Sequence, residues 1–246
     1  MAEVSPVDEA IENLVAANRI LAMERVLDAF GHISVRHPAR NDRYFMSRSI
    51  APAQVSAADI VEHTMDNEAA HDKDRAVKFY YERWIHGEVY KARPDVGAIV
   101  HSHSPTVVPF ASTKAPLRPL LHNACFLGFG APVFEIRNHV AHSDLMISTA
   151  ALGKAMAGTL GKTADVVLLR GHGNVVVGPS IQIAVFRAYY TEINARQQLQ
   201  AITLDPGNVV YMDAGECETA DKAMQAVVGR PWDLWKSKVM KWSWCQ

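Results

Sequence analysis

The chain has 246 residues, 49% of them hydrophobic and 21% charged, which is the composition of an ordinary globular protein of one or two domains. Its net charge of -1 gives no electrostatic basis for binding nucleic acid or an acidic membrane surface. No apolar run approaches the roughly 20 residues that a membrane span needs. We therefore expect neither nucleic acid nor a membrane as a partner.

The cysteine pattern favours a reducing compartment. Cys125, Cys217 and Cys245 are widely separated and form no C-x-x-C pair, so neither a disulfide framework nor a zinc ribbon is indicated. The first residues also lack the basic and then apolar pattern of a signal peptide. We expect a cytoplasmic protein.

The first part of the chain is predicted to form one helix and three strands. Apolar residues at helical spacing predict a helix over residues 7–29, closed by Gly31. Alternation over residues 32–36 predicts a strand with Ile33 and Val35 on one face and three polar residues on the other, namely His32, Ser34 and Arg36. Two more strands are expected at residues 43–48 and 60–63.

The middle of the chain contains a strand that leads into two histidines. A helix is predicted over residues 76–92, and Pro94 stops it. The apolar run at residues 96–100 predicts a buried strand, and H-S-H-S-P follows it directly. Because side chains alternate along an extended chain, His101 and His103 are expected to point the same way.

The remaining elements alternate between helices and strands. Helices are predicted to open at Ser104 and to span residues 148–160 and 180–204. Strands are predicted at residues 131–136, 165–169 and 175–177, with a tight turn at residues 171–174. The tail is predicted to form an amphipathic helix that carries Trp232, Trp235, Trp242 and Trp244. We expect one α/β or α+β domain over residues 1–246, with residues 205–246 as a C-terminal extension.

Two converging imidazoles are half of a site for a first-row transition metal, and three residues are candidates to complete it. His172 follows a predicted buried strand and is flanked by glycines that allow a sharp turn. Glu82 lies on the predicted helix that precedes the strand at residues 96–100, with His86 one turn later. It could serve as a fourth ligand or as a proton-transfer group. His32 lies on the polar face of the early strand.

Each of these residues also has a structural interpretation. An H-x-H pair alone is a weak signal, and His172 could be a turn residue. Glu82 could pair with Arg83 or Lys78 on a solvated helix face. His86 is expected to be a packing or supporting residue and not a ligand, and Ser49 a capping or turn residue. Four further histidines without a partner pattern are expected at the surface: His63, His71, His139 and His142.

Four motifs together resemble the class II aldolase/adducin family. They are G-H-I-S-V-R at residues 31–36, E-x-x-x-H-x-x-x-Y-x-x-R-P-D at 82–95, V-H-S-H-S-P at 100–105 and L-L-R-G-H-G-N-V-V-V-G at 168–178. The resemblance implies a three-layer α/β/α fold with a largely antiparallel central sheet. It also implies a homotetramer with sites at the subunit interfaces. Carried over to this chain, it makes His101, His103 and His172 the ligands of a divalent metal and Glu82 the catalytic acidic residue.

Departures from the sugar-phosphate aldolases of the family bear on the substrate. Those enzymes resemble one another in three elements of a phosphate cradle, G-N-I-S, a T-P-S-G loop and a serine pair. In their place this chain has Gly31-His-Ile-Ser, Ser47-Arg-Ser-Ile50 and Tyr80-Tyr81. The aldolases' proton-donating tyrosine would fall near His122-Asn123, where this chain has no tyrosine. A phosphorylated sugar substrate and classical aldol cleavage are therefore both disfavoured.

In having a histidine after Gly31, the chain resembles a branch of the family whose members decarboxylate hydroxylated aromatic (pyridine) dicarboxylates. The leading hypothesis is a metal-dependent lyase, with zinc or manganese, that decarboxylates a non-phosphorylated hydroxyaromatic acid. The alternatives are an aldolase or retro-aldolase for an unphosphorylated hydroxy-ketone or hydroxy-keto acid, and an adducin-like module without catalysis. The small-molecule substrate is expected to contact His32, Arg36, Ser47, Arg48, Tyr81, His122 and Asn123.

Overall fold

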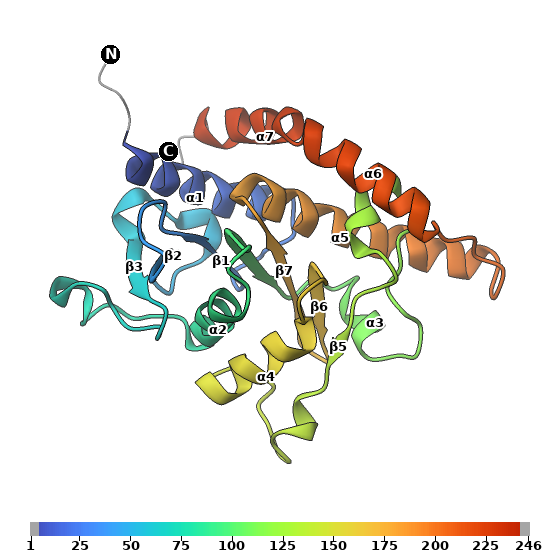
Figure 1. Ribbon diagram of the computed structural model, residues 1–246, viewed down its shortest axis with the longest axis horizontal. Helices are drawn as coiled ribbons and strands as arrows, with labels where there is room; N and C mark the ends of the chain where they lie inside the picture. Colours follow the sequence, from blue (N-terminus) through green and yellow to red (C-terminus); the bar gives the residue numbers. More distant parts are fainter. Residues whose placement is uncertain (1–4, 242–246) are drawn as a thin grey trace.

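The computed structural model describes residues 5–241, which form three layers. The middle layer is a seven-stranded sheet in the order β3-β2-β1-β4-β7-β6-β5, in which only the β5–β6 pair is parallel. The strands are β1 (His32–Arg36), β2 (Arg43–Ser47), β3 (Ile60–Thr64), β4 (Ala98–Ser102), β5 (Val133–Phe134), β6 (Val166–Leu169) and β7 (Gly173–Gly178). This largely antiparallel sheet confirms the predicted fold class (Figure 1).

Helices cover both faces of the sheet. One face carries α1 (Pro6–Met23), α5 (Ile181–Leu204) and α7 (Gly229–Lys241), and the other carries α2 (Trp84–Ala92) and α4 (Ala150–Leu160) (Figure 1). The short helix α3 (Val108–Ala111) lies beside β6, and α6 (Ala214–Val227) lies against the 3-10 segment His122–Leu127.

Alternating side chains of the central strands feed two separate hydrophobic cores. Val100 of β4 packs in the core with α1 and α5, whereas Ile99 packs in the core with α2 and α4. On β1, Ile33 and Val35 join the first core, and the polar residues face α2, as the alternation predicted. Polar side chains therefore collect between the sheet and α2, and this is the layer in which the candidate site lies.

Two predicted helices are shorter than expected. The first ends at Met23 and not at Ala29, because Arg25 takes a left-handed backbone conformation with φ of 60°. The second does not start at Ala76: α2 begins at Trp84, and residues 75–80 run as an irregular segment. The Tyr80 hydroxyl bonds to the backbone of Ile50, so a tertiary contact overrides the local helical preference there.

Other element boundaries also differ from the prediction. The β4 strand continues through His101 to Ser102, and the helix expected at Ser104 starts only at Val108. The strand expected over residues 131–136 is reduced to Val133–Phe134. The β7 strand starts at Gly173, inside the predicted turn, where a Cβ would lie 2.1 Å from the backbone oxygen of Ser102. Only glycine lets these two strands approach so closely.

The C-terminal extension folds back onto its own chain. Trp232 and Trp235 are buried, and Trp235 packs edge-on against Tyr189 of α5 at 5.1 Å between ring centroids. These two tryptophans therefore pack into the core of their own chain. Trp242 and Trp244 lie outside the described residues.

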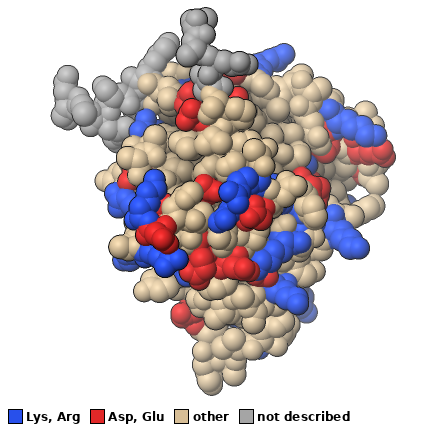
Figure 2. Space-filling model, turned by 60° about the vertical axis from the view of Figure 1, so that its left-hand side comes forward, with Lys and Arg blue, Asp and Glu red and all other residues tan. Residues whose placement is uncertain are grey.

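Surface charge is mixed on the face shown in Figure 2, where lysines and arginines alternate with aspartates and glutamates. Within residues 5–241, no helix combines the length and the apolar character needed to cross a bilayer. One expected surface histidine, His63, is instead buried between Tyr44 and Phe79.

Candidate metal centre and pocket

The site begins at the end of β4. His101 is fully buried, and its Nδ1 donates a hydrogen bond to the backbone oxygen of Asn174 on β7 at 3.1 Å. This bond assigns the proton to Nδ1 and leaves the lone pair of Nε2 free. Metal-ligating histidines are usually oriented in this way, with one ring nitrogen bonded to a backbone carbonyl and the other facing the metal.

Two more imidazoles meet this nitrogen. The Nε2 of His103 lies 3.1 Å from the Nε2 of His101 and 3.0 Å from the Nε2 of His172. Burial, together with the neighbouring His101 and His172, lowers the pKa of His103 to about 4. The ring is therefore neutral at pH 7, which is the form that binds metals.

Glu82 completes the cluster from the other layer. It lies in the 3-10 turn Tyr81–Arg83 that precedes α2, with non-helical φ and ψ of -89° and 17°. One carboxylate oxygen accepts the backbone N–H of Ile147 at 2.9 Å, and the other lies 3.4 Å from Nε2 of both His101 and His172. Burial raises the pKa of Glu82, whereas a proton on the His101 or His172 ring lowers it well below its usual range.

The four side chains fit a divalent cation. The ligand atoms of Glu82, His101, His103 and His172 all lie within 4.8 Å of one another. Imidazole nitrogens that ligate one tetrahedral zinc at about 2.0–2.1 Å lie roughly 3.3 Å apart, close to the separations seen here. Three Nε2 lone pairs and a carboxylate oxygen directed at one point would repel one another without a cation between them.

A pocket of about 410 Å³ opens onto this cluster. His103, Glu82 and His32 form its polar end, and Lys78 adds an ammonium group. Its other walls are largely apolar and aromatic, and include Phe30, Ile50, Tyr80, Tyr81 and Met146. Gly31, with φ of 84°, turns the chain into β1 at the pocket's edge, where a Cβ would meet the backbone oxygen of His101 at 2.8 Å.

A chain of buried hydrogen bonds runs from the pocket into the layer between the sheet and α2. The His32 Nδ1 lies 2.7 Å from the His86 Nε2, and the His86 Nδ1 lies 2.6 Å from the Ser34 hydroxyl. That hydroxyl lies 2.8 Å from the phenol of Tyr90. His86 thus supports His32 and does not join the cluster, as the sequence interpretation expected.

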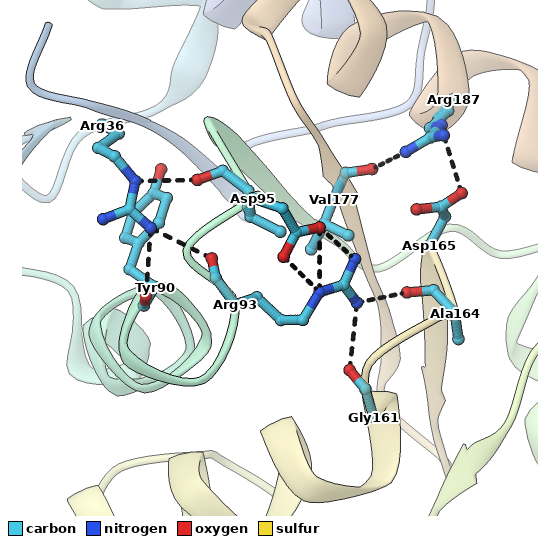
Figure 3. A network of polar contacts seen from close by, with 10 residues as sticks. Arg36, Tyr90, Arg93, Asp95, Gly161, Ala164, Asp165, Val177 and Arg187 are labelled. Carbon is cyan, nitrogen blue, oxygen red and sulfur yellow. Dashed lines mark hydrogen bonds and ion pairs between the residues drawn. The ribbon is translucent and has the colours of Figure 1, made fainter.

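The other residues proposed for substrate binding are scattered. Arg36 directs its guanidinium away from the pocket, to backbone oxygens of Val96, Tyr90 and Arg93 (Figure 3). Arg48 pairs with Asp59 at 2.6 Å. Neither arginine lines the pocket.

Three smaller side chains also lie outside the pocket wall. Ser47 is buried behind it and contacts Tyr80 at 3.3 Å between hydroxyls. His122 and Asn123 lie in the 3-10 segment against α6, and the amide of Asn123 contacts the sulfur of Met224. Of the predicted substrate residues, the pocket brings together only His32 and Tyr81.

Sequence reasoning missed part of the pocket wall. Lys78 was considered only as an ion-pair partner of Glu82, and Tyr80 only as part of a pair replacing two serines. Phe30 and Met146 gave no signal: Phe30 lies in the loop just before the motif at residues 31–36, and Met146 enters from a loop outside all four motifs. The departure from the expected helix at residues 76–80 is what turns Lys78 and Tyr80 toward the pocket.

Comparison with known proteins identifies the family. The family described as Class II Aldolase and Adducin N-terminal domain matches residues 12–199. Decarboxylase tropJ from Talaromyces stipitatus is 35% identical over an alignment of 254 positions, gaps included, which covers 95% of each chain. The 3,4-dihydroxyphthalate decarboxylase from Rhodococcus jostii is 30% identical over 139 residues, 54% of each chain. A solved structure of an aldolase II superfamily protein from Pseudomonas syringae shares the fold, with a TM-score of 0.79 at 20% identity over 97% of this chain and 95% of that one.

Proposed function

The chain belongs to the class II aldolase and adducin family and is a lyase, and we propose that it decarboxylates a hydroxylated aromatic acid without a phosphate group. Three observations support the substrate class. Two relatives are named decarboxylases, and one of them is named for a dihydroxylated aromatic dicarboxylate. The pocket is walled by aromatic and apolar side chains, and it contains one ammonium group, that of Lys78.

The observation that carries the proposal is where the cluster lies. Glu82 and His103 are both pocket-lining residues and members of the four-residue cluster. A flat ring held between Tyr80 and the loop residues Phe30 and Ile50 would therefore present its polar substituents to the cluster. An adducin-like module without catalysis does not need a pocket that ends on a complete set of metal ligands.

The residues divide the chemistry among them. A divalent cation held by His101, His103 and His172 would act as a Lewis acid for the negative charge that develops as the carbon–carbon bond breaks. Lys78 would bind a carboxylate of the substrate. Glu82 would accept the proton of the substrate hydroxyl and return a proton to the ring carbon that CO2 leaves. The donor set suits zinc or manganese equally.

The test is release of CO2 from purified protein. Hydroxylated aromatic mono- and dicarboxylates are incubated with protein loaded with Mn²⁺ or Zn²⁺, and CO2 and the decarboxylated product are measured together. The matched control is His71→Ala, because His71 lies on the surface away from the cluster. Turnover of an unphosphorylated aldol donor and acceptor, with no CO2 from any of these acids, would establish the retro-aldolase alternative instead.

We also propose that the protein is a homotetramer with its sites at subunit interfaces. Large apolar side chains are exposed on one chain, among them Phe129, Leu204 and Val210 at 85–87%. His122 and Asn123 would then reach the pocket of a neighbouring subunit, since they do not line that of their own. Light scattering coupled to size-exclusion chromatography tests the assembly, and a monomer at micromolar concentration would contradict it.

A further inference from the structure

His32 touches the candidate site but does not belong to the metal-ligand cluster. Its ring lies 5.0 Å from that of His101 between centroids, and the two residues are direct neighbours in the register of β1 and β4. It also lines the pocket. Even so, the set of converging ligand atoms comprises Glu82 and three other histidines. The hydrogen-bond chain behind His32 offers a physical reason.

That chain has two possible directions. In the outward direction, Tyr90 donates to Ser34, Ser34 to the His86 Nδ1, and the His86 Nε2 to the His32 Nδ1. His32 must then carry its proton on Nε2, facing the pocket. In the inward direction every donor and acceptor is exchanged, and the Nε2 of His32 keeps a lone pair that could ligate a metal.

The phenol of Tyr90 selects between the two directions. In the inward direction its oxygen accepts from Ser34, and its own O–H needs another acceptor. Tyr90 is only 2% exposed, and the Ser34 hydroxyl is the sole hydrogen-bond partner of its phenol among the described residues. A buried donor without an acceptor is costly, whereas the outward direction satisfies every proton in the chain. A positive charge on either imidazole would also leave a proton on the His32 Nε2.

We propose that Tyr90, Ser34 and His86 fix His32 in the Nε2–H tautomer, so that it donates a hydrogen bond to an anionic oxygen of the substrate and cannot ligate the metal. The inference rests on the proposed function only for the identity of that oxygen. His32 would be a catalytic residue, since it touches the substrate. The other three would be positioning residues that act through it.

Neutron diffraction tests the tautomer directly. Crystals of the zinc-loaded protein, grown in D2O, should show a deuteron on the Nε2 of His32 and none on its Nδ1. A deuteron on Nδ1, or a zinc ligated by His32, overturns the proposal whether or not the protein decarboxylates any acid. A deuteron on Nε2 in a protein that releases no CO2 supports the tautomer and contradicts only the proposed function.

Binding of salicylate, a simple hydroxyaromatic carboxylate, tests the donated hydrogen bond. A hydrogen bond to a charged group is typically associated with a change of roughly 10–100-fold in affinity. His32→Leu should weaken salicylate binding to zinc-loaded protein by that factor in calorimetry, with zinc content unchanged. His63→Leu is the control, because it removes a buried histidine that takes no part in the hydrogen-bond chain from Tyr90 to His32. Unchanged salicylate affinity in His32→Leu, or loss of zinc, would refute the donor role.

The positioning role is tested by rescue. His86→Gln keeps an N–H at the place of the histidine Nε2, whereas His86→Leu removes it. Both variants lose the same buried imidazole and should lose similar stability. If the chain acts by orienting His32, salicylate affinity should be largely retained in His86→Gln and reduced in His86→Leu. Equal affinities in the two variants would assign His86 a packing role alone.

Discussion

The layer between the sheet and α2 holds nitrogen-bearing polar side chains at both ends, but with different hydrogen-bond pairing. At one end, His101, His103 and His172 direct ring nitrogens at a common point beside an open pocket. At the other end, Arg93 bonds through all three guanidinium nitrogens to Asp95 and to the backbone oxygens of Gly161 and Ala164 (Figure 3). The two ends differ in whether the polar groups already have protein partners.

This difference separates functional from structural polar residues more clearly than residue type does. Arg36 has a planar guanidinium whose N–H donors suit a carboxylate, yet these donors bond to backbone oxygens of the protein. The metal cluster, in contrast, gathers acceptors that no protein donor pairs with fully, which leaves chemistry for a ligand. The predictions below change one end at a time, and the two ends should respond in different observables.

The largest effect is expected from removing a ring nitrogen at the open end. His172→Ala should lose most of its bound metal, and turnover should fall by roughly a thousand-fold, because a Lewis acid contributes several kcal/mol to the barrier. The thermal midpoint of the metal-free protein should change little, since His172 lies in a partly exposed turn. Metal analysis and a turnover assay measure the first two quantities, and thermal unfolding of the metal-free protein measures the third. Full metal content in His172→Ala would remove this residue from the ligand set.

Glu82→Gln should separate catalysis from metal binding. The amide keeps the hydrogen bond from the Ile147 N–H but cannot accept a proton from the substrate. We expect turnover to fall by roughly 10²–10³-fold, the range for a general acid–base group, with more than half of the metal retained. Turnover at the native level would exclude Glu82 from proton transfer.

A change at a buried ion pair of α5, drawn beside Arg93 in Figure 3, should affect stability and leave the chemistry alone. Arg187 bonds to Asp165 at 2.8 Å and to the backbone oxygen of Val177, and its side chain is only 7% exposed. Arg187→Met would leave Asp165 without its cation and should lower the free energy of unfolding by about 3 kcal/mol. Turnover per folded molecule should be unchanged. Urea unfolding and active-site titration distinguish the two effects.

The pH dependence provides a control for Arg187→Met. Burial raises the pKa of Asp165 to about 6 even beside Arg187. An acid whose pKa is raised in the folded state binds more protons folded than unfolded, so it destabilises increasingly as pH rises from about 4 to 6. The cost of Arg187→Met should therefore be larger at pH 8 than at pH 5. Asp165→Asn in the same protein should relieve it, and a pH-independent cost would contradict this account.

Much of the site was predictable because it depends on local alternation. The polar face of β1 and the common direction of His101 and His103 follow from an extended backbone, and the structure has both. The limits of the helices were not predictable, because tertiary contacts decide them. Arg36 shows the same for function. The sequence indicates a guanidinium that could bind a carboxylate, but only the fold shows that backbone oxygens of α2 and of the segment after it accept its hydrogen bonds.

Paired lysine and arginine variants compare the two ends for substrate binding. Lys78 lines the pocket and is exposed, whereas Arg36 does not line it. Lys78→Met should raise KM for the aromatic acid about tenfold, the scale of one hydrogen bond to a charged group, with kcat nearly unchanged. Arg36→Met should leave KM within about twofold and lower stability by about 1 kcal/mol through its lost backbone bonds. The opposite pattern would restore Arg36 as the carboxylate ligand.

The smallest effect concerns His63, a histidine that belongs to neither end. It is buried against Tyr44, and neither ring nitrogen has a hydrogen-bond partner among the described residues. Burial, with a smaller contribution from Arg83, lowers its pKa to about 3. A base whose pKa is depressed by folding binds fewer protons folded than unfolded. Its contribution to stability is therefore complete above the unfolded pKa of about 6.5 and decreases as pH falls from there toward 3.

His63→Phe should remove this dependence. Between pH 7 and pH 6 the wild-type protein should lose about 0.7 kcal/mol more of its unfolding free energy than the variant, as one linked proton requires. At pH 7 the variant should be at least as stable, because a ring without unpaired nitrogens replaces one with two. Urea unfolding of both metal-free proteins at the two pH values measures the difference. Parallel pH profiles would mean that His63 gains a hydrogen-bond partner in solution and that burial without a partner does not set its pKa.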